Sequence, residues 1–93
     1  MAGKIEFDWD DENRKHLAAH KVAPAEFEQV LNNDPVDLHY GLIDNEGRYR
    51  SVGFTNGGRL LSVAWTIRNG MVRAITAFPA SPSDRMAFLE RLK

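Results

Sequence analysis

The chain has 93 residues, of which 43% are hydrophobic and 27% are charged. This length supports one modest core, so we expect a single domain over residues 1–93. The absence of cysteine excludes disulfides and thiolate metal sites. No apolar run approaches the roughly 20 residues of a membrane span, and residues 1–6 lack the apolar core of a signal peptide. We therefore expect a cytoplasmic protein that does not bind membranes.

The formal net charge of −1 conceals an uneven distribution along the chain. Residues 1–46 contain four basic and eleven acidic residues, a net charge of −7, whereas residues 47–93 contain eight basic and two acidic residues, a net charge of +6. Such a split is typical of a protein with a nucleic-acid face or a docking surface for an acidic partner. The alternative is that the two halves pair with each other, and the sequence leaves both explanations open.

The first third of the chain predicts a strand and two helices. Residues 4–9 alternate apolar and charged side chains, which indicates a strand with one buried face. Asp10 suits the N-cap of a helix that runs to about His20, because its carboxylate can accept hydrogen bonds from the free amides of the next turn. Pro24 suits the first position of a second helix over about residues 24–32.

The rest of the chain predicts an antiparallel meander followed by a helix. We expect strands at residues 36–43, 48–54, 59–67 and 71–78, separated by turns rich in Asn, Asp and Gly. The third strand is apolar on both faces and is predicted to be central. Ser81 and Pro82 then mark the start of the closing helix. The predicted order is β-α-α-β-β-β-β-α, an α+β fold with one antiparallel sheet packed against helices.

Two histidines on the first helix are candidates for chemistry. His16 and His20 are four residues apart and lie on one helical face. The metalloprotease signature requires a glutamate after the first histidine, where Leu17 stands, and no third ligand is evident, so we expect no metal. Acid–base catalysis stays open for His16, because histidine is the residue type whose ordinary proton exchange falls near neutral pH. His20 is expected to pack or to cap near the end of its helix.

Arginines of the predicted sheet are the second candidate set. Arg48 and Arg50 share one strand face by the period of two. A ribonuclease that works without a metal needs cations near the scissile phosphate, a base for the ribose 2′-hydroxyl and an acid for the leaving oxygen. Arginines and histidine can supply these groups, although arginines on exposed strands are usually only solvated. Glu46 is expected to be an ordinary solvated turn residue. No Gly-rich phosphate loop is present, and no cofactor is expected.

Several short motifs occur in an order and spacing that are more specific than any one of them. They are Phe7-x-Trp9-Asp10, the helix with His16 and His20, Pro24-x-Glu26-Phe27-Glu28, Asn33-Asp34-Pro35, Glu46-Gly47-Arg48-Tyr49-Arg50-Ser51-Val52-Gly53-Phe54 and Thr66-x-Arg68-x-Gly70-x-Val72-Arg73. In this arrangement the chain resembles the BrnT-like toxins, small RelE-like endoribonucleases of type II toxin–antitoxin pairs. The resemblance implies a RelE-like domain and a metal-independent endoribonuclease that cleaves mRNA and inhibits growth.

The resemblance also yields expectations for residues and partners. The expected catalytic set is His16, Arg48, Arg50 and Arg73, and the expected RNA contacts are Lys21, Arg59 and Arg68. We expect a cognate antitoxin that covers the basic half, an RNA substrate, and contact with DNA only through the antitoxin. A homodimer stays open.

One departure from the family pattern motivates a second hypothesis. The last strand of BrnT-like toxins commonly ends Ile-Ser-Ala-Arg, whereas this chain has Ile75-Thr76-Ala77-Phe78. An uncharged aromatic ring cannot offset phosphate charge. The alternative function is therefore a catalytically inactive, toxin-like module for protein interaction.

Overall fold

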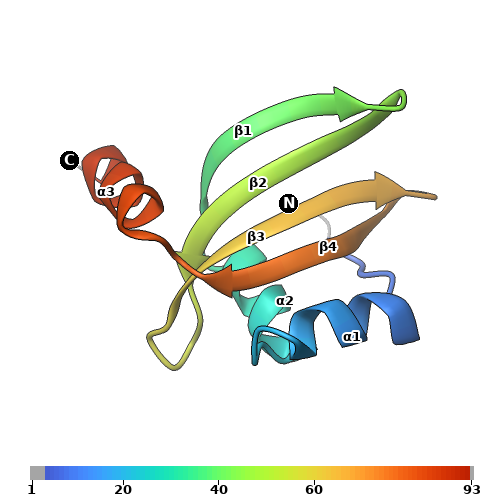
Figure 1. Ribbon diagram of the computed structural model, residues 1–93, viewed down its shortest axis with the longest axis horizontal. Coiled ribbons are helices and arrows are strands. Elements are labelled where there is room, and N and C mark those ends of the chain that lie inside the picture. The colour runs from blue at the N-terminus through green and yellow to red at the C-terminus, as the bar shows by residue number, and fades with distance from the viewer. Residues whose placement is uncertain (1–3, 93) are drawn as a thin grey trace.

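The computed structural model describes residues 4–92 and shows an α+β fold (Figure 1). Two helices come first, then four strands, then one helix, and the strands form one antiparallel sheet in the order β1-β2-β3-β4. The α+β class, the meander and the central position of the third strand are confirmed. The elements are α1 (Asp11–Ala18), α2 (Pro24–Asn32), β1 (Val36–Ile43), β2 (Glu46–Phe54), β3 (Leu60–Arg68), β4 (Met71–Pro79) and α3 (Pro82–Arg91).

The predicted N-terminal strand is wrong, because residues 4–10 form no strand. A single parallel bridge joins Phe7 to Val72 of β4, through two backbone hydrogen bonds of 2.8 Å. The apolar alternation instead serves packing, since the rings of Phe7 and Trp9 meet the ring of Phe27 of α2 edge-on. Helix α1 begins directly after Asp10, so the extended segment is too short to pair further.

The predicted caps are confirmed and set the helix starts. Asp10 accepts a hydrogen bond from the Asn13 amide at 3.0 Å, and the Asn13 side chain accepts one from the Asp10 amide at 2.9 Å. Ser81 caps α3 by accepting from the amide of Asp84. Helix α1 ends at Ala18, two residues before the predicted end, and the chain reverses at Lys21, where φ is 58°.

Two-residue turns determine how the strands pair. Asp44 and Asn45 connect β1 to β2 with φ values of 52° and 65°, and Asn69 and Gly70 connect β3 to β4 with values of 54° and 76°. Two-residue hairpins favour this left-handed backbone, because its twist matches that of the strands. The turn after β1 is therefore shorter than predicted, and β2 begins at Glu46.

The helices cover the two faces of the sheet unequally. Helices α1 and α2 pack on one face, over a core that includes Leu17, Phe27, Leu61 and Val63. Side chains alternate along a strand, so Leu60, Ser62, Arg48 and Arg50 belong to the other face. We call it the arginine face. Helix α3 covers only one end of it, where Phe88 packs on Val52 and Leu60.

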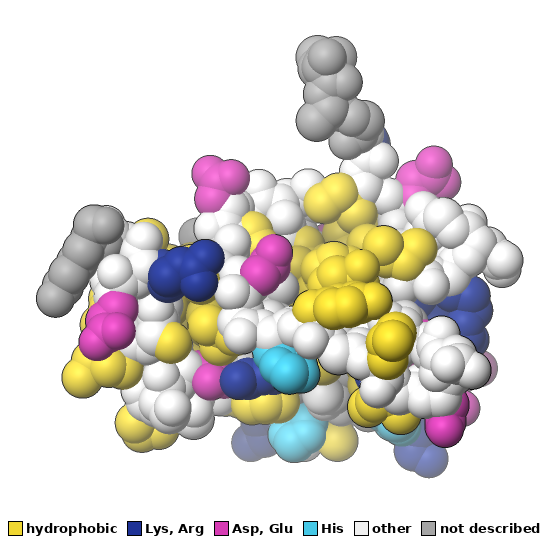
Figure 2. Space-filling model, turned by 90° about the horizontal axis from the view of Figure 1, so that it is seen from above, with side chains coloured by type: hydrophobic (Ala, Val, Ile, Leu, Met, Phe, Trp, Pro, Cys, Tyr) yellow, Lys and Arg dark blue, Asp and Glu magenta, His cyan; other side chains and the backbone are white. Residues whose placement is uncertain are grey.

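The face opposite to the arginines carries a row of aromatic rings. The ring centroids of Tyr40 and Tyr49 are 4.7 Å apart, and those of Tyr49 and Trp65 are 4.2 Å apart with the rings nearly parallel. Viewed from above, the β1 side of the molecule shows a patch of hydrophobic side chains with charged ones around it (Figure 2). Within residues 4–92, no helix is long and apolar enough to cross a membrane.

Candidate functional site

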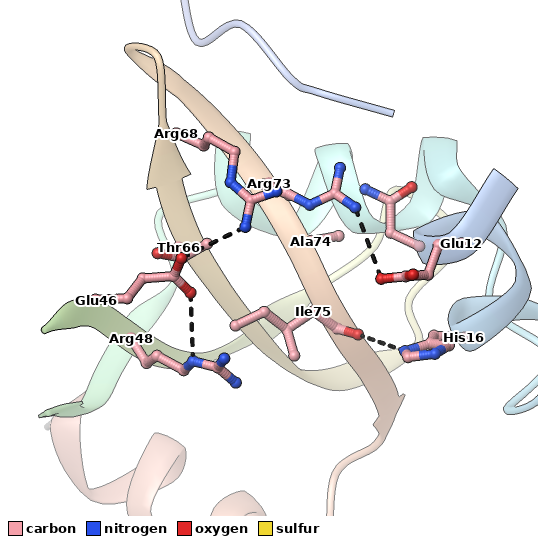
Figure 3. A pocket seen from close by; sticks show the side chains of 10 residues that line it. Glu12, His16, Glu46, Arg48, Thr66, Arg68, Arg73, Ala74 and Ile75 are labelled. Carbon is pink, nitrogen blue, oxygen red and sulfur yellow. Dashed lines mark hydrogen bonds and ion pairs between the residues drawn. The ribbon is translucent and has the colours of Figure 1, made fainter. Parts of the chain in front are cut away.

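A cleft of about 230 Å³ lies where the arginine face meets helix α1 (Figure 3). Helix α1 runs along the edge strand β4 and supplies one wall, and the strands supply the floor and the opposite wall. Polar and charged side chains predominate in the lining, which consists of Glu12, Asn13, His16, Glu46, Arg48, Thr66, Arg68, Arg73, Ala74 and Ile75.

Arg48 and Arg68 form the sheet side of the cleft, with Glu46 between them. The Glu46 carboxylate lies 3.5 Å from Arg48 Nε and 3.4 Å from Arg68 Nη2. Both contacts are long, and Arg48 Nε is buried without a hydrogen bond from any part of the chain that the structure describes. The side chains of Arg48 and Arg68 are 39% and 52% exposed, so both guanidinium groups can reach a ligand in the cleft.

Arg73 is held more tightly, by carboxylates of the N-terminal segment and α1. Its Nη2 lies 2.7 Å from Asp10, and Asp8 and Glu12 lie 3.6 and 3.9 Å from its guanidinium. The hydrogen bond to Asp10 raises the pKa of Arg73. The pKa of Asp10 is lowered, first by the amide of Asn13 and then by Arg73. Arg73 therefore lines the cleft while joining the start of α1 to β4.

His16 approaches the cleft from α1. Its Nδ1 lies 3.3 Å from the carbonyl oxygen of Ile75. A carbonyl oxygen can only accept, so Nδ1 donates this hydrogen bond and Nε2 stays available for chemistry. The pairing of β4 with β3 shifts by one residue here, since Ala64 faces Thr76 and Trp65 faces Ala74. This shift is a β-bulge, and Ile75 is its extra residue. Bulges beside functional sites often change the direction of a side chain.

Arg50, a predicted catalytic residue, does not line the cleft. It donates a short hydrogen bond to Asp84 of α3, and the Ser62 hydroxyl donates to the same carboxylate oxygen at 2.7 Å. Burial acts to raise the pKa of Asp84, but the hydrogen bonds from Arg50 and Ser62 outweigh it and hold the pKa below its ordinary value. This network fastens α3 to the sheet.

Two of the predicted RNA contacts also lie elsewhere. Arg59 donates to both carboxylate oxygens of Glu26 at 2.9 Å and to the backbone oxygen of Lys21 at 3.1 Å. The pKa of Glu26 is lowered, first by the backbone amide of Ala23 and then by Arg59. Arg59 and Lys21 thus meet near the start of α2, and Arg68 is the predicted RNA contact that lines the cleft.

His20 and Phe78 form a neighbouring contact beyond the cleft. Their ring centroids are 5.9 Å apart, with the rings tilted by 58°. This agrees with the expectation that His20 packs against the fold. Among residues 4–92, no three His, Asp or Glu side chains are grouped as metal ligands would be.

Ion pairs between the two halves of the chain explain part of the charge split. Basic residues of the second half pair with carboxylates of the first half; they are Arg48, Arg59, Arg68 and Arg73.

Sequence reasoning missed Glu46 as a site residue, although the period of two that aligned Arg48 with Arg50 also places Glu46 on that face. The sequence pattern placed Glu46 within the turn and so predicted a solvated residue, whereas it is the first residue of β2.

Comparison with known families gives one match. Residues 9–84 match a family model described as a ribonuclease toxin, BrnT, of type II toxin–antitoxin systems. The matched segment contains every residue that lines the cleft. No curated protein matches the chain closely enough to count as a relative.

Proposed function

Since this chain belongs to the BrnT family of ribonuclease toxins of type II toxin–antitoxin systems, we propose that it is an endoribonuclease that cleaves mRNA and slows growth when free of its antitoxin. Membership in a type II toxin family implies a cognate antitoxin. We propose that this antitoxin covers the cleft and so keeps RNA away from it. The chain then meets DNA only through a DNA-binding antitoxin.

The observation that carries the proposal is the meeting of His16, Arg48 and Arg68 in one cleft. These residues are brought together from α1, β2 and β3, and the two arginines are half-exposed. Guanidinium groups bind phosphate oxygens with paired hydrogen bonds and keep their charge at all relevant pH values. Arg48 and Arg68 are therefore suited to hold the scissile phosphate and to stabilise the charge that grows on it in the transition state.

His16 supplies the proton transfer in this proposal. Its Nδ1 is fixed by the Ile75 carbonyl, and fixing one ring nitrogen orients the other for catalysis. Arg73 already has three carboxylates around it, with Asp10 at 2.7 Å, so we assign it to ordering α1 and to the positive field of the cleft. Arg50, which binds Asp84, is assigned to anchoring α3.

A second candidate is an interaction module without catalysis. The specific observation in its favour is that each cleft arginine already has a carboxylate partner within the chain. A phosphate would have to displace Glu46 from Arg48 and Arg68. The two candidates therefore differ in whether RNA can compete with this internal carboxylate.

Induced expression in a bacterial host tests the proposal, with growth and RNA integrity followed together. Wild type should arrest growth with cleaved RNA, and His16→Ala and Arg48→Ala should lose both effects. His20→Ala is the matched control, because it removes a histidine of the same region that does not line the cleft. Normal growth with intact RNA, from soluble folded wild type that binds a neighbouring-gene product tightly, would favour the interaction module.

A further inference from the structure

We propose that the open edge of β1 binds β1 of a second copy of this chain, so that the two sheets become one continuous sheet across a two-fold axis at Gly41. An edge strand presents backbone donors and acceptors that no neighbouring strand uses, and another strand can bind them. No residue of β1 lines the cleft, so this surface is independent of the proposed ribonuclease function.

The two edges of the sheet differ in what lies against them. At β4, the backbone of the N-terminal segment is hydrogen-bonded to Val72 on both sides of Phe7 at 2.8 Å, and α1 runs alongside the strand. Within residues 4–92, β1 pairs only with β2, and it forms the outer rim of the sheet in Figure 1. The edge of β1 is therefore the open one.

The second half of β1 lacks the features that usually protect an open edge. Soluble proteins place lysine, proline or a bulge on such strands. The bulge of β1 lies before this half, between Asp37 and His39, and residues 39–43 contain neither lysine nor proline. Hydrophobic side chains gather on this side of the molecule in Figure 2. The exposed large apolar side chains of β1 are Tyr40 (55%), Leu42 (67%) and Ile43 (52%).

The hairpin after β1 determines which backbone groups point outward. Ile43 and Glu46 flank a two-residue turn, so the carbonyl oxygen of Ile43 accepts from the amide of Glu46, and Ile43 directs its backbone groups to β2. This direction alternates along an antiparallel strand. Gly41 therefore also faces β2, whereas the N–H and C=O groups of Tyr40 and Leu42 point away from the sheet.

A two-fold axis at Gly41 satisfies these outward groups. It places Tyr40 of each copy opposite Leu42 of the other, so that their N–H and C=O groups find partners in both directions. The two residues at the axis then form the closer kind of antiparallel pair, with Cα atoms about 4.5 Å apart. Glycine inside a strand often marks such a close approach of another backbone.

The fold of a single copy gives no rigid reason for glycine at position 41. The φ angle of Gly41 is not among the positive values. The three atoms nearest to the place of a Cβ, the closest at 3.0 Å, all belong to the ring of His39, a side chain that can turn away. The approach of a second backbone supplies the reason that the single copy lacks.

The side chains match in the same arrangement. On the aromatic side of the sheet, Tyr40 meets Leu42 of the other copy. On the arginine face, where His39 lies opposite Arg50, His39 meets Ile43 of the other copy. Each exposed apolar side chain of β1 thus gains a neighbour, and no two like charges stand opposite each other. A two-fold axis uses one patch twice, so this self-matching selects a second copy over a strand of another protein.

Sedimentation of the purified full chain tests the proposal. The mass of wild type should rise from 10.5 kDa toward twice that value as its concentration increases. Leu42→Lys places a charge at the centre of the interface and should stay monomeric over the same range. Ile67→Lys is the matched control, because Ile67 is also exposed (53%) but lies on β3, and this variant should dimerise like wild type. Circular dichroism shows whether both variants are folded.

Hydrogen exchange tests the pairing without any substitution, so it decides the matter even where a variant does not fold. The amides of Tyr40 and Leu42 should become protected as the concentration of wild type rises. The amides of Gly41 and Ile43, which face β2, should be protected at every concentration.

A single cysteine tests the register, because the chain has none of its own. Under mild oxidation, Gly41→Cys should form a disulfide-linked dimer, since Cα atoms about 4.5 Å apart lie within the disulfide range. Ile67→Cys, away from the edge, should remain monomeric under the same conditions.

Several results would overturn the proposal. Wild type that stays monomeric at every concentration would do so, and so would a dimer that Leu42→Lys does not weaken. Failure of Gly41→Cys to cross-link would overturn the axis at Gly41. Protection of Tyr40 and Leu42 only after a purified antitoxin is added would assign the edge to another protein instead of a second copy. None of these results depends on RNA cleavage, so the ribonuclease function is judged separately.

Discussion

Removal of the Asp84 carboxylate should destabilise the fold without touching the cleft. In Asp84→Ala the fully buried Ser62 hydroxyl loses its acceptor. A buried polar group without a partner costs about 1–3 kcal/mol. Arg50 also loses its partner, but its side chain is 39% exposed and rehydrates, so this loss adds little. We expect a total of about 2 kcal/mol, which for a domain of this size lowers Tm by about 10 °C.

Thermal unfolding followed by circular dichroism measures this effect, and a double-mutant cycle isolates its cause. Replacing both partners of a buried hydrogen bond by apolar groups can be nearly neutral. Ser62→Ala combined with Asp84→Ala should therefore be more stable than the sum of the single changes predicts, by about 1 kcal/mol. Additive effects, or a Tm for Asp84→Ala equal to that of wild type, would refute the reasoning. RNA cleavage below Tm should stay within a few-fold of wild type, because neither residue lines the cleft.

Further predictions concern acid stability, the cleft arginines and one glycine. Hydrogen bonding lowers the pKa of Asp84 despite its burial. The contribution of this carboxylate to stability is therefore complete above its unfolded-state pKa near 3.8, and it is lost as pH falls through the lower native value. In an acid titration, the free energy of unfolding of Asp84→Asn should depend less on pH than that of wild type. Arg48→Met should reduce the slope of log K for RNA binding against log salt concentration by about 0.7, whereas Arg73→Met should mainly lower Tm. The opposite result would mean that Arg73 contacts RNA and that Arg48 stabilises the fold. Gly53→Ala should cost about 1–3 kcal/mol in chemical denaturation, since its Cβ would lie 3.3 Å from a backbone carbon before β1, whereas Gly57→Ala, with its nearest contact at 3.8 Å, should be close to neutral.

Local sequence signals predicted most of the fold correctly, and the failure is instructive. The caps at Asp10 and Ser81 depend on amides at most three residues away, so the sequence contains the whole interaction. The sheet follows from alternation and from turn residues that tolerate positive φ. Residues 4–9 show the same alternation but form no strand, because the segment pairs with β4 at a single bridge while Phe7 and Trp9 pack on the core beside α2. Alternation with a period of two indicates that one side of a segment is buried, but it does not identify the element that buries it.

The sequence by itself determined the family pattern, the order of helices and strands after Asp10, and the kinds of side chain available for chemistry. Only the tertiary structure decided which of them meet. Arg48 and Arg50 share a strand face, yet only Arg48 lines the cleft. Arg50 instead pairs with Asp84, which is 34 residues further along the chain. His16 enters the site by contact with Ile75, 59 residues away. Periodicity and capping act over a few residues, whereas the partner of each charge depends on strand register and helix docking, which bring distant parts of the chain together.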